Sequence, residues 1–222
     1  MSAGVVVAID GPSGSGKSTV ARAVAAVLGL PVLDTGAMYR AITLAVLEAG
    51  AALDDERACA GVARAIAIGV EDGTTTVDGR DVSTEIRGPA VTASVSTLAA
   101  HPAVRAILVA QQRDWVARHG GGVVEGRDIG SVVFPGAAVK VFLTASETER
   151  ARRRQRDEVT AERAVAVDDV QADLERRDAI DAGRAVSPLR AAADAMVIDS
   201  THLDVEAVVR EIVARARAVE AG

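Results

Sequence analysis

Residues 11–18, Gly-Pro-Ser-Gly-Ser-Gly-Lys-Ser, have the types and spacing needed to hold the phosphates of a nucleotide. The glycines let the backbone approach phosphate oxygens, Lys17 reaches the terminal phosphates, and the hydroxyl of Ser18 is placed to bind Mg²⁺. A glycine-rich turn that binds nothing is the alternative. We predict a phosphate loop with Ser18 as the metal ligand, formed by Gly11, Pro12, Ser13, Gly14, Ser15, Gly16, Lys17, Ser18 and Thr19.

A second set of charged residues follows the predicted strands or lies on one predicted helix and its exit. Its members are Asp34-Thr35-Gly36 with Arg40, then Gly126-Arg127-Asp128, then Arg177, Asp181 and Arg184. In an open α/β sheet, ligands bind at the carboxyl ends of the strands, so at least the first two groups should face the nucleotide phosphates. The three histidines are not beside a candidate nucleophile.

Several fixed cations are what phosphoryl transfer between two nucleotides would require. Each pair of unit charges 4 Å apart repels by roughly 4 kcal/mol at an effective dielectric of 20. An acceptor phosphate is already an anionic nucleophile, so catalysis needs positioning and charge neutralisation but no general base. The abundance of arginine in these loops fits that demand.

The densest arginine cluster lies between residues 150 and 156. It is either a solvated helix with pairs such as Glu149–Arg153 at i,i+4, or a mobile lid that closes over a triphosphate, and one helix can be both. We expect a lid over residues 148–167, with Arg153 acting in catalysis. The cluster consists of Arg150, Arg152, Arg153, Arg154 and Arg156.

The elements that must position these residues alternate between strand and helix. Strands are expected at 5–10, 31–34, 123–125, 140–143 and 195–199, and helices at 17–28, 37–48, 55–67, 90–99, 102–118 and 205–219. Hairpin signals at Glu71-Asp72-Gly73 and Asp78-Gly79 indicate a small antiparallel insertion at 67–89. We predict one α/β domain over 1–222, a parallel sheet with helices on both faces.

Composition narrows the class of protein. A net charge of −6 argues against a binder of duplex nucleic acid, and an aromatic content of 2% argues against stacking on single strands. No apolar run approaches the ~20 residues of a membrane span, and no secretory signal is recognisable, so we expect a cytoplasmic protein. Cys59 is the only cysteine and is expected in the core.

Four motifs in order resemble bacterial cytidylate kinase, a family of P-loop nucleoside monophosphate kinases. They are the phosphate loop, Leu33-Asp34-Thr35-Gly36-Ala37-Met38-Tyr39-Arg40, Gly126-Arg127-Asp128-Ile129-Gly130 with Val133-Phe134-Pro135, and Arg184-Ala185-Val186-Ser187-Pro188-Leu189. The resemblance implies transfer of the ATP γ-phosphate to CMP or dCMP with Mg²⁺, giving ADP and CDP or dCDP. We expect a monomer.

The resemblance also implies individual roles. It places Thr35, Arg40 and Arg127 at the acceptor phosphate, Ser96, Arg105 and Asp128 at the cytosine edge, Arg177 and Asp181 near the sugar, and Arg184 towards the phosphates or base. We expect Lys17, Arg127, Arg184 and Arg153 to be catalytic. For the lid, only the positive charge is carried over from the family, and the individual roles of its arginines stay open. Ser96 satisfying nearby backbone, Arg105 on the surface, and Asp181 pairing with Arg177 remain open alternatives. The chain departs from the family in a short insertion and an unusually arginine-dense lid.

Other functions compete with this one. A GTPase that selects guanine by Asn-Lys-x-Asp is excluded because the chain contains no asparagine. A kinase for a small alcohol, of the shikimate or gluconate type, would need help in deprotonating its substrate. A kinase for another monophosphate, such as UMP, and a structural ATP-binding module are the remaining candidates.

Overall fold

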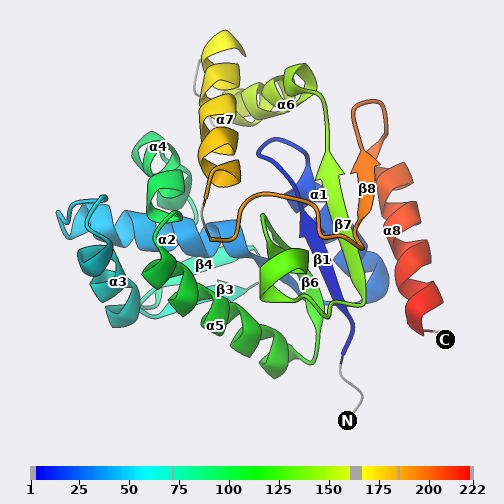
Figure 1. Cartoon of the computed structure of the whole chain (residues 1–222), viewed down its shortest axis with the longest axis horizontal. Helices are drawn as coiled ribbons and strands as arrows, with labels where there is room; N and C mark the ends of the chain where they lie inside the picture. The colour runs from blue at the N-terminus through cyan, green and yellow to red at the C-terminus, as the bar shows by residue number, and fades with distance from the viewer. Residues whose placement is uncertain (1–3, 72, 161–166, 185, 221–222) are drawn as a thin grey trace.

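A five-stranded parallel sheet forms the centre of the protein, with strand order β2-β6-β1-β7-β8 (Figure 1). The structure is a computed structural model, and it describes residues 4–71, 73–160, 167–184 and 186–220. The strands are β1 Val6–Asp10, β2 Val32–Asp34, β6 Gly122–Gly126, β7 Val139–Thr144 and β8 Met196–Asp199. All five predicted strands are confirmed, with boundaries shifted by two residues or fewer.

Helices cover both faces of the sheet, as predicted, because the side chains of a strand point alternately to opposite faces. Val7 and Ile9 pack with α1 (Lys17–Leu28) and α8 (Val205–Glu220). Ala8 points to the other face, where four further helices build the core. These are α2 Thr35–Glu48, α3 Glu56–Ala65, α4 Pro89–Leu98 and α5 Pro102–His119. Cys59 is fully buried in this second core.

The predicted antiparallel insertion is present as a three-stranded sheet in the order β3-β4-β5. Its strands are β3 Ile68–Glu71, β4 Thr74–Val77 and β5 Arg80–Asp81, followed by the short helix η1, Glu85–Arg87. Asp78 and Gly79 turn the chain with φ of 50° and 81°, the left-handed conformation that a tight hairpin requires. Val77, Val82 and Ile86 pack this sheet against α2.

The arginine-dense segment forms the helix α6, Glu147–Thr160, and α7, Val167–Ala182, packs against it (Figure 1). The Ser146 hydroxyl accepts a hydrogen bond from the Glu149 backbone N–H at 3.3 Å and so caps the N-terminus of α6. The expected lid, 148–167, therefore coincides with α6, and its part from 161 to 166 lies outside the described residues. Closure of this lid stays a prediction.

The segment after β6 contains an element that the sequence analysis does not predict. Residues Ile129–Val133 form a single π-helical turn, η2. The carboxylate of Asp10, at the end of β1, accepts hydrogen bonds from the backbone N–H groups of Ile129 at 2.7 Å and Gly130 at 2.8 Å. Asp10 thereby ties the start of this turn to the central strand.

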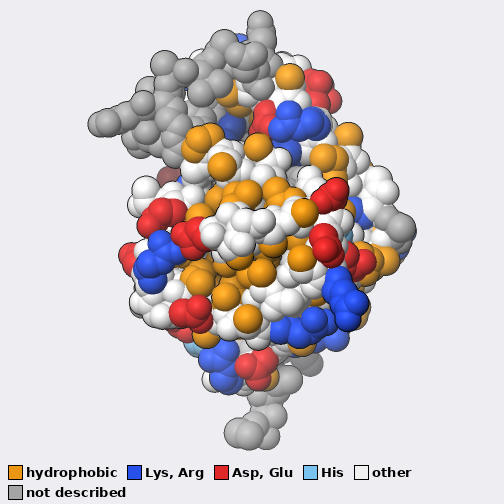
Figure 2. Space-filling model, turned by 90° about the vertical axis from the view of Figure 1, so that its left-hand side faces the viewer, with side chains coloured by type: hydrophobic (Ala, Val, Ile, Leu, Met, Phe, Trp, Pro, Cys, Tyr) orange, Lys and Arg blue, Asp and Glu red, His pale blue; other side chains and the backbone are white. Residues whose placement is uncertain are grey.

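One face of the molecule, to the left in Figure 1, has a patch of apolar side chains at its centre, with basic and acidic side chains dispersed around it (Figure 2). On this face the described residues show no continuous basic stripe of the kind that duplex nucleic acid requires. Within the described ranges, no single helix is long and apolar enough to cross a membrane. The helices α4 and α5 pass that test only as a pair, and they are bent by 100°.

Candidate active site

A pocket of about 930 Å³ opens at the carboxyl ends of β2 and β6, where ligands bind in sheets of this kind. Most of the residues predicted for the site line it, although they come from segments far apart in the chain. From the phosphate loop they are Ser13, Gly14, Ser15, Gly16, Lys17, Ser18 and Thr19, and from elsewhere Thr35, Arg40, Ser96, Arg105, Arg127, Asp128, Arg153, Arg177, Asp181 and Arg184. Gly11 and Pro12 precede this lining, at the junction with β1.

The phosphate loop connects β1 to α1, with Lys17 as the first helical residue. The Nζ of Lys17 donates to the carbonyl oxygen of Pro12 at 2.6 Å and lies 3.4 Å from the Ser15 hydroxyl. Burial, together with the positive charge of Arg127, lowers the pKa of Lys17 to about 7. A phosphate entering the loop would therefore meet an ammonium group that the protein alone stabilises poorly.

Glu125 is a site residue that sequence reasoning missed. The Ser18 hydroxyl donates to its Oε2 at 2.9 Å, and the Thr35 hydroxyl donates to its backbone carbonyl at 2.7 Å. Burial and the nearby charge of Asp34 raise the pKa of Glu125 to about 7. The sequence places Glu125 at the end of a predicted strand, but its position beside the loop follows from the pairing of β6 with β1.

Arg105 and Asp128 form an ion pair in which both side chains are almost entirely buried, with exposed fractions of 4% and 6%. The Arg105 guanidinium also lies over the Tyr39 ring, 5.6 Å from its centroid. Ser96, itself buried, lines the same pocket. The interpretation of Arg105 as an ordinary surface residue is therefore wrong. A buried ion pair in a pocket presents fixed donors and acceptors to a ligand.

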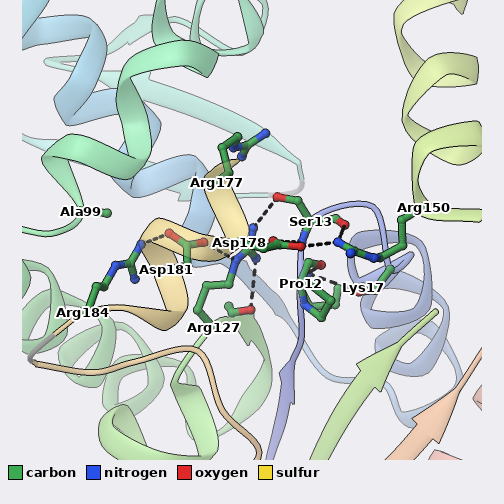
Figure 3. A network of polar contacts seen from close by, with 12 residues as sticks. Pro12, Ser13, Lys17, Ala99, Arg127, Arg150, Arg177, Asp178, Asp181 and Arg184 are labelled. Carbon is green, nitrogen blue, oxygen red and sulfur yellow. Dashed lines mark hydrogen bonds and ion pairs between the residues drawn. The ribbon is translucent and has the colours of Figure 1, made fainter. Parts of the chain in front are cut away.

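Arg127 links the phosphate loop to α7 (Figure 3). It donates from Nη2 to the Ser13 hydroxyl at 2.8 Å and from Nε to Asp181 at 3.0 Å. Asp181 forms a second ion pair with Arg184, so it bridges two arginines instead of pairing with Arg177.

Arg177 is buried, and its Nε has no hydrogen-bond partner in the part of the chain that the structure describes. Its nearest carboxylate belongs to Asp173, at 3.9 Å. Burial and the charge of Arg127 lower its pKa to about 10. An unsatisfied, buried guanidinium favours an anionic ligand nearby.

Arg40 reaches the pocket from α2. It donates to the carbonyl oxygen of Ile86 at 3.0 Å and to the Thr92 hydroxyl at 2.9 Å. Burial, followed by the charge of Arg177, lowers its pKa to about 9. Both partners are neutral, and the described residues place no carboxylate within ion-pair distance of Arg40. Arg40 thus adds to the cationic character of the pocket.

Arg153 makes contacts both within its own helix and with the phosphate loop. It pairs with Glu149 at i,i+4, with 3.0 Å between Nε and Oε1. It also reaches the phosphate loop, donating to the carbonyl oxygen of Ser15 at 3.2 Å and to that of Ser200 at 2.8 Å. The side chain thus connects α6 to the loop, and a role in a closing lid stays a prediction.

Comparison with known proteins agrees with this geometry. A sequence model of the family described as cytidylate kinase matches residues 7–218. The cytidylate kinase of Mycolicibacterium paratuberculosis is 52% identical over 207 residues, covering 91% of each chain. That of Nocardia farcinica is 50% identical over 212 residues, covering 94% of this chain and 91% of the relative.

Solved structures support the fold alone. A gluconokinase from Sinorhizobium meliloti superimposes with a TM-score of 0.51 at 18% identity, covering 99% of this chain and 95% of the other. This likeness shows that the chain and that structure share an overall fold. With half of its residues identical to cytidylate kinases over almost its whole length, the chain belongs to the cytidylate kinase family.

Proposed function

We propose that this protein transfers the γ-phosphate of ATP to CMP or dCMP, giving ADP and CDP or dCDP. The observation that carries the proposal is a phosphate loop and a buried Arg105–Asp128 pair in one pocket. The loop suits a triphosphate, and the pair suits the edge of a base. Family membership supports both the donor and the acceptor.

The arginines between the phosphate loop and the Arg105–Asp128 pair would provide the catalysis. Arg127 contacts the loop and α7, Arg184 shares Asp181 with it, and Arg153 lies over the loop. Together with Lys17 they would neutralise the charge that two nucleotide phosphates bring into contact. The acceptor phosphate would itself be an anionic nucleophile, so the proposed reaction needs no general base.

The donors around Ser18 fit Mg²⁺, which prefers oxygen ligands and usually keeps several waters and substrate phosphates in its shell. The Ser18 hydroxyl is the expected direct ligand, and the buried carboxylate of Glu125 lies 2.9 Å from it. The ion, when bound, would supply positive charge to the bridging phosphate oxygens. No group of three or more His, Cys, Asp or Glu side chains that could hold a metal ion is found in the described ranges.

Selection of cytosine would follow from hydrogen-bond chemistry. Cytosine presents an amino donor beside ring N3 and O2 acceptors, which suits a carboxylate next to an arginine or hydroxyl. Uracil has a carbonyl oxygen in place of the amino group and an N–H donor at N3. Asp128 would therefore face a carbonyl oxygen. Unpaired buried groups cost ~1 to 3 kcal/mol each, enough to disfavour UMP by one or two orders of magnitude.

Asp10 is a positioning residue in this proposal, because it holds the turn that follows Asp128. In Asp10→Asn one oxygen still accepts a backbone N–H, while the new amide nitrogen opposes the other. We expect the KM for CMP to rise about tenfold, with a smaller change in the KM for ATP. Initial rates with each substrate varied in turn measure both.

The pH dependence gives this prediction a second readout. Burial raises the pKa of Asp10 to about 6, so its carboxylate is ionised above that pH and accepts both N–H groups fully only there. The difference in the KM for CMP between Asp10→Asn and the wild type should therefore become smaller as the pH falls below 6. A KM for CMP that is the same in both proteins at pH 8 would contradict the assigned role.

A substrate screen tests the proposed function directly. ATP and Mg²⁺ are combined with CMP, dCMP, UMP, AMP, GMP, shikimate and gluconate, and ADP formation is measured. We expect turnover with CMP or dCMP, and with UMP at a kcat/KM lower by about one to two orders of magnitude. Turnover of an alcohol but not of CMP would favour the small-molecule kinase. ATP binding without any turnover would leave a structural ATP-binding module.

A further inference from the structure

The phosphate loop is already in contact with a carboxylate of the protein. Asp178, on α7, accepts a hydrogen bond from the backbone N–H of Ser13 at 3.2 Å and forms an ion pair with Arg150 of α6 (Figure 3). Arg150 in turn donates to the carbonyl oxygen of Ser13 at 3.1 Å. The Asp178–Arg150 pair therefore binds both the backbone N–H and the backbone carbonyl oxygen of Ser13.

The hydrogen bond from the Ser13 N–H to Asp178 resembles one that a nucleotide phosphate would accept. Backbone N–H groups of a phosphate loop are donors to phosphate oxygens, and a carboxylate oxygen is an acceptor of the same charge sign. Asp178 is largely removed from water, with an exposed side-chain fraction of 17%, and that of Arg150 is 8%. The partners are held within the protein and are not a loose surface pair.

Helix α6 approaches the loop closely at the same point. A Cβ atom added to Gly14, which has φ of 75°, would lie 2.8 Å from the backbone carbonyl oxygen of Arg150. The Nε of Arg150 is buried and has no hydrogen-bond partner among the residues that the structure describes. The arginine thus retains a donor beyond those used by Asp178 and Ser13.

We propose that Asp178 is a placeholder for a phosphate of the donor nucleotide and that it limits donor affinity. When the triphosphate enters, repulsion between like charges moves the carboxylate off the Ser13 N–H. Arg150 then exchanges its carboxylate partner for the phosphates, and no covalent bond changes. The proposal rests on the proposed function only in requiring that a nucleotide binds this loop.

The test is direct binding of the donor to Asp178→Asn by calorimetry, with the Mg²⁺ complex of a non-hydrolysable ATP analogue as the probe and no CMP present. The amide keeps the size of the side chain and removes its charge. We expect a Kd about tenfold lower than in the wild type. If Asp178 only maintains the shape of the loop, the Kd will stay within twofold or rise, and the proposal is wrong.

Glu175→Gln is the matched control. It makes the same carboxylate-to-amide change on α7, at an exposed residue whose partner is Gln171, at 2.8 Å. It should leave the Kd unchanged. If it tightens binding as much as Asp178→Asn does, a general loss of negative charge explains the result and the placeholder role fails.

A second measurement needs no variant. In a crystal structure of the wild-type protein with the same analogue, we expect the Asp178 carboxylate to lie beyond hydrogen-bond distance from the Ser13 nitrogen. Retention of that hydrogen bond with a triphosphate in the loop would overturn the proposal. A wild-type protein that binds no ATP analogue would instead overturn the proposed function, so the two failures are distinguishable.

Discussion

Lys17→Ala is expected to lower kcat by about 10³-fold, because it removes a charged donor to the phosphoryl group that is transferred. Lys17 is buried, and within the described ranges its Nζ donates hydrogen bonds to two neutral oxygens of the loop. A bound triphosphate would add a negatively charged partner in direct contact with it. The loss should therefore appear mainly in kcat, measured at saturating ATP and CMP in a coupled assay.

The chain offers a matched control for this change, because Lys140 is its only other lysine. Lys140 is on β7, where it pairs with Asp194 at 2.8 Å, and it does not line the pocket. Lys140→Ala should keep kcat within about twofold of the wild type. If Lys17→Ala retains more than a tenth of wild-type kcat while thermal unfolding shows both variants folded, the role assigned to Lys17 is wrong.

The fold was largely predictable because its signals are local. The apolar strand before the loop, the alternation of strands with helices, and the Asp78-Gly79 turn each have one physical explanation in the sequence. The π-helical turn at 129–133 was not predictable in this way. Its start is tied to Asp10, which is distant in sequence and is brought close only by the pairing of β1 with β6.

The same distinction separates the site residues that were found from those that were missed. Lys17, Arg127 and Asp128 stand in glycine-containing motifs whose chemistry can be read along the chain. Glu125 and Asp178 carry no motif of their own. Their importance lies in the atoms they meet, the Ser18 hydroxyl and the Ser13 N–H, at sequence separations of 107 and 165 residues. Only the tertiary structure supplies those partners.

Asp128→Asn is expected to lower the preference for CMP over UMP by about 30-fold, measured as the ratio of the two kcat/KM values. The amide oxygen can still accept from Arg105, but its NH₂ group then opposes the cytosine amino group and can donate to the uracil carbonyl. CMP should lose affinity and UMP should gain it. The KM for ATP should stay within about twofold, because the phosphate loop is unchanged.

Asparagine is chosen over alanine because removing one member of a buried ion pair also lowers the stability of the protein. Truncating one member of a buried ion pair destabilises a protein by about 3 to 5 kcal/mol, since it strands the other charge. Asp128→Ala would leave Arg105 in that state, whereas asparagine preserves volume and one acceptor. Asp114→Asn, at an exposed residue paired with Arg118 on α5, controls for the loss of one negative charge. If Asp128→Asn and Asp114→Asn show the same CMP to UMP ratio, Asp128 does not read the base, and selection of the pyrimidine must reside in Ser96 or in the backbone around it.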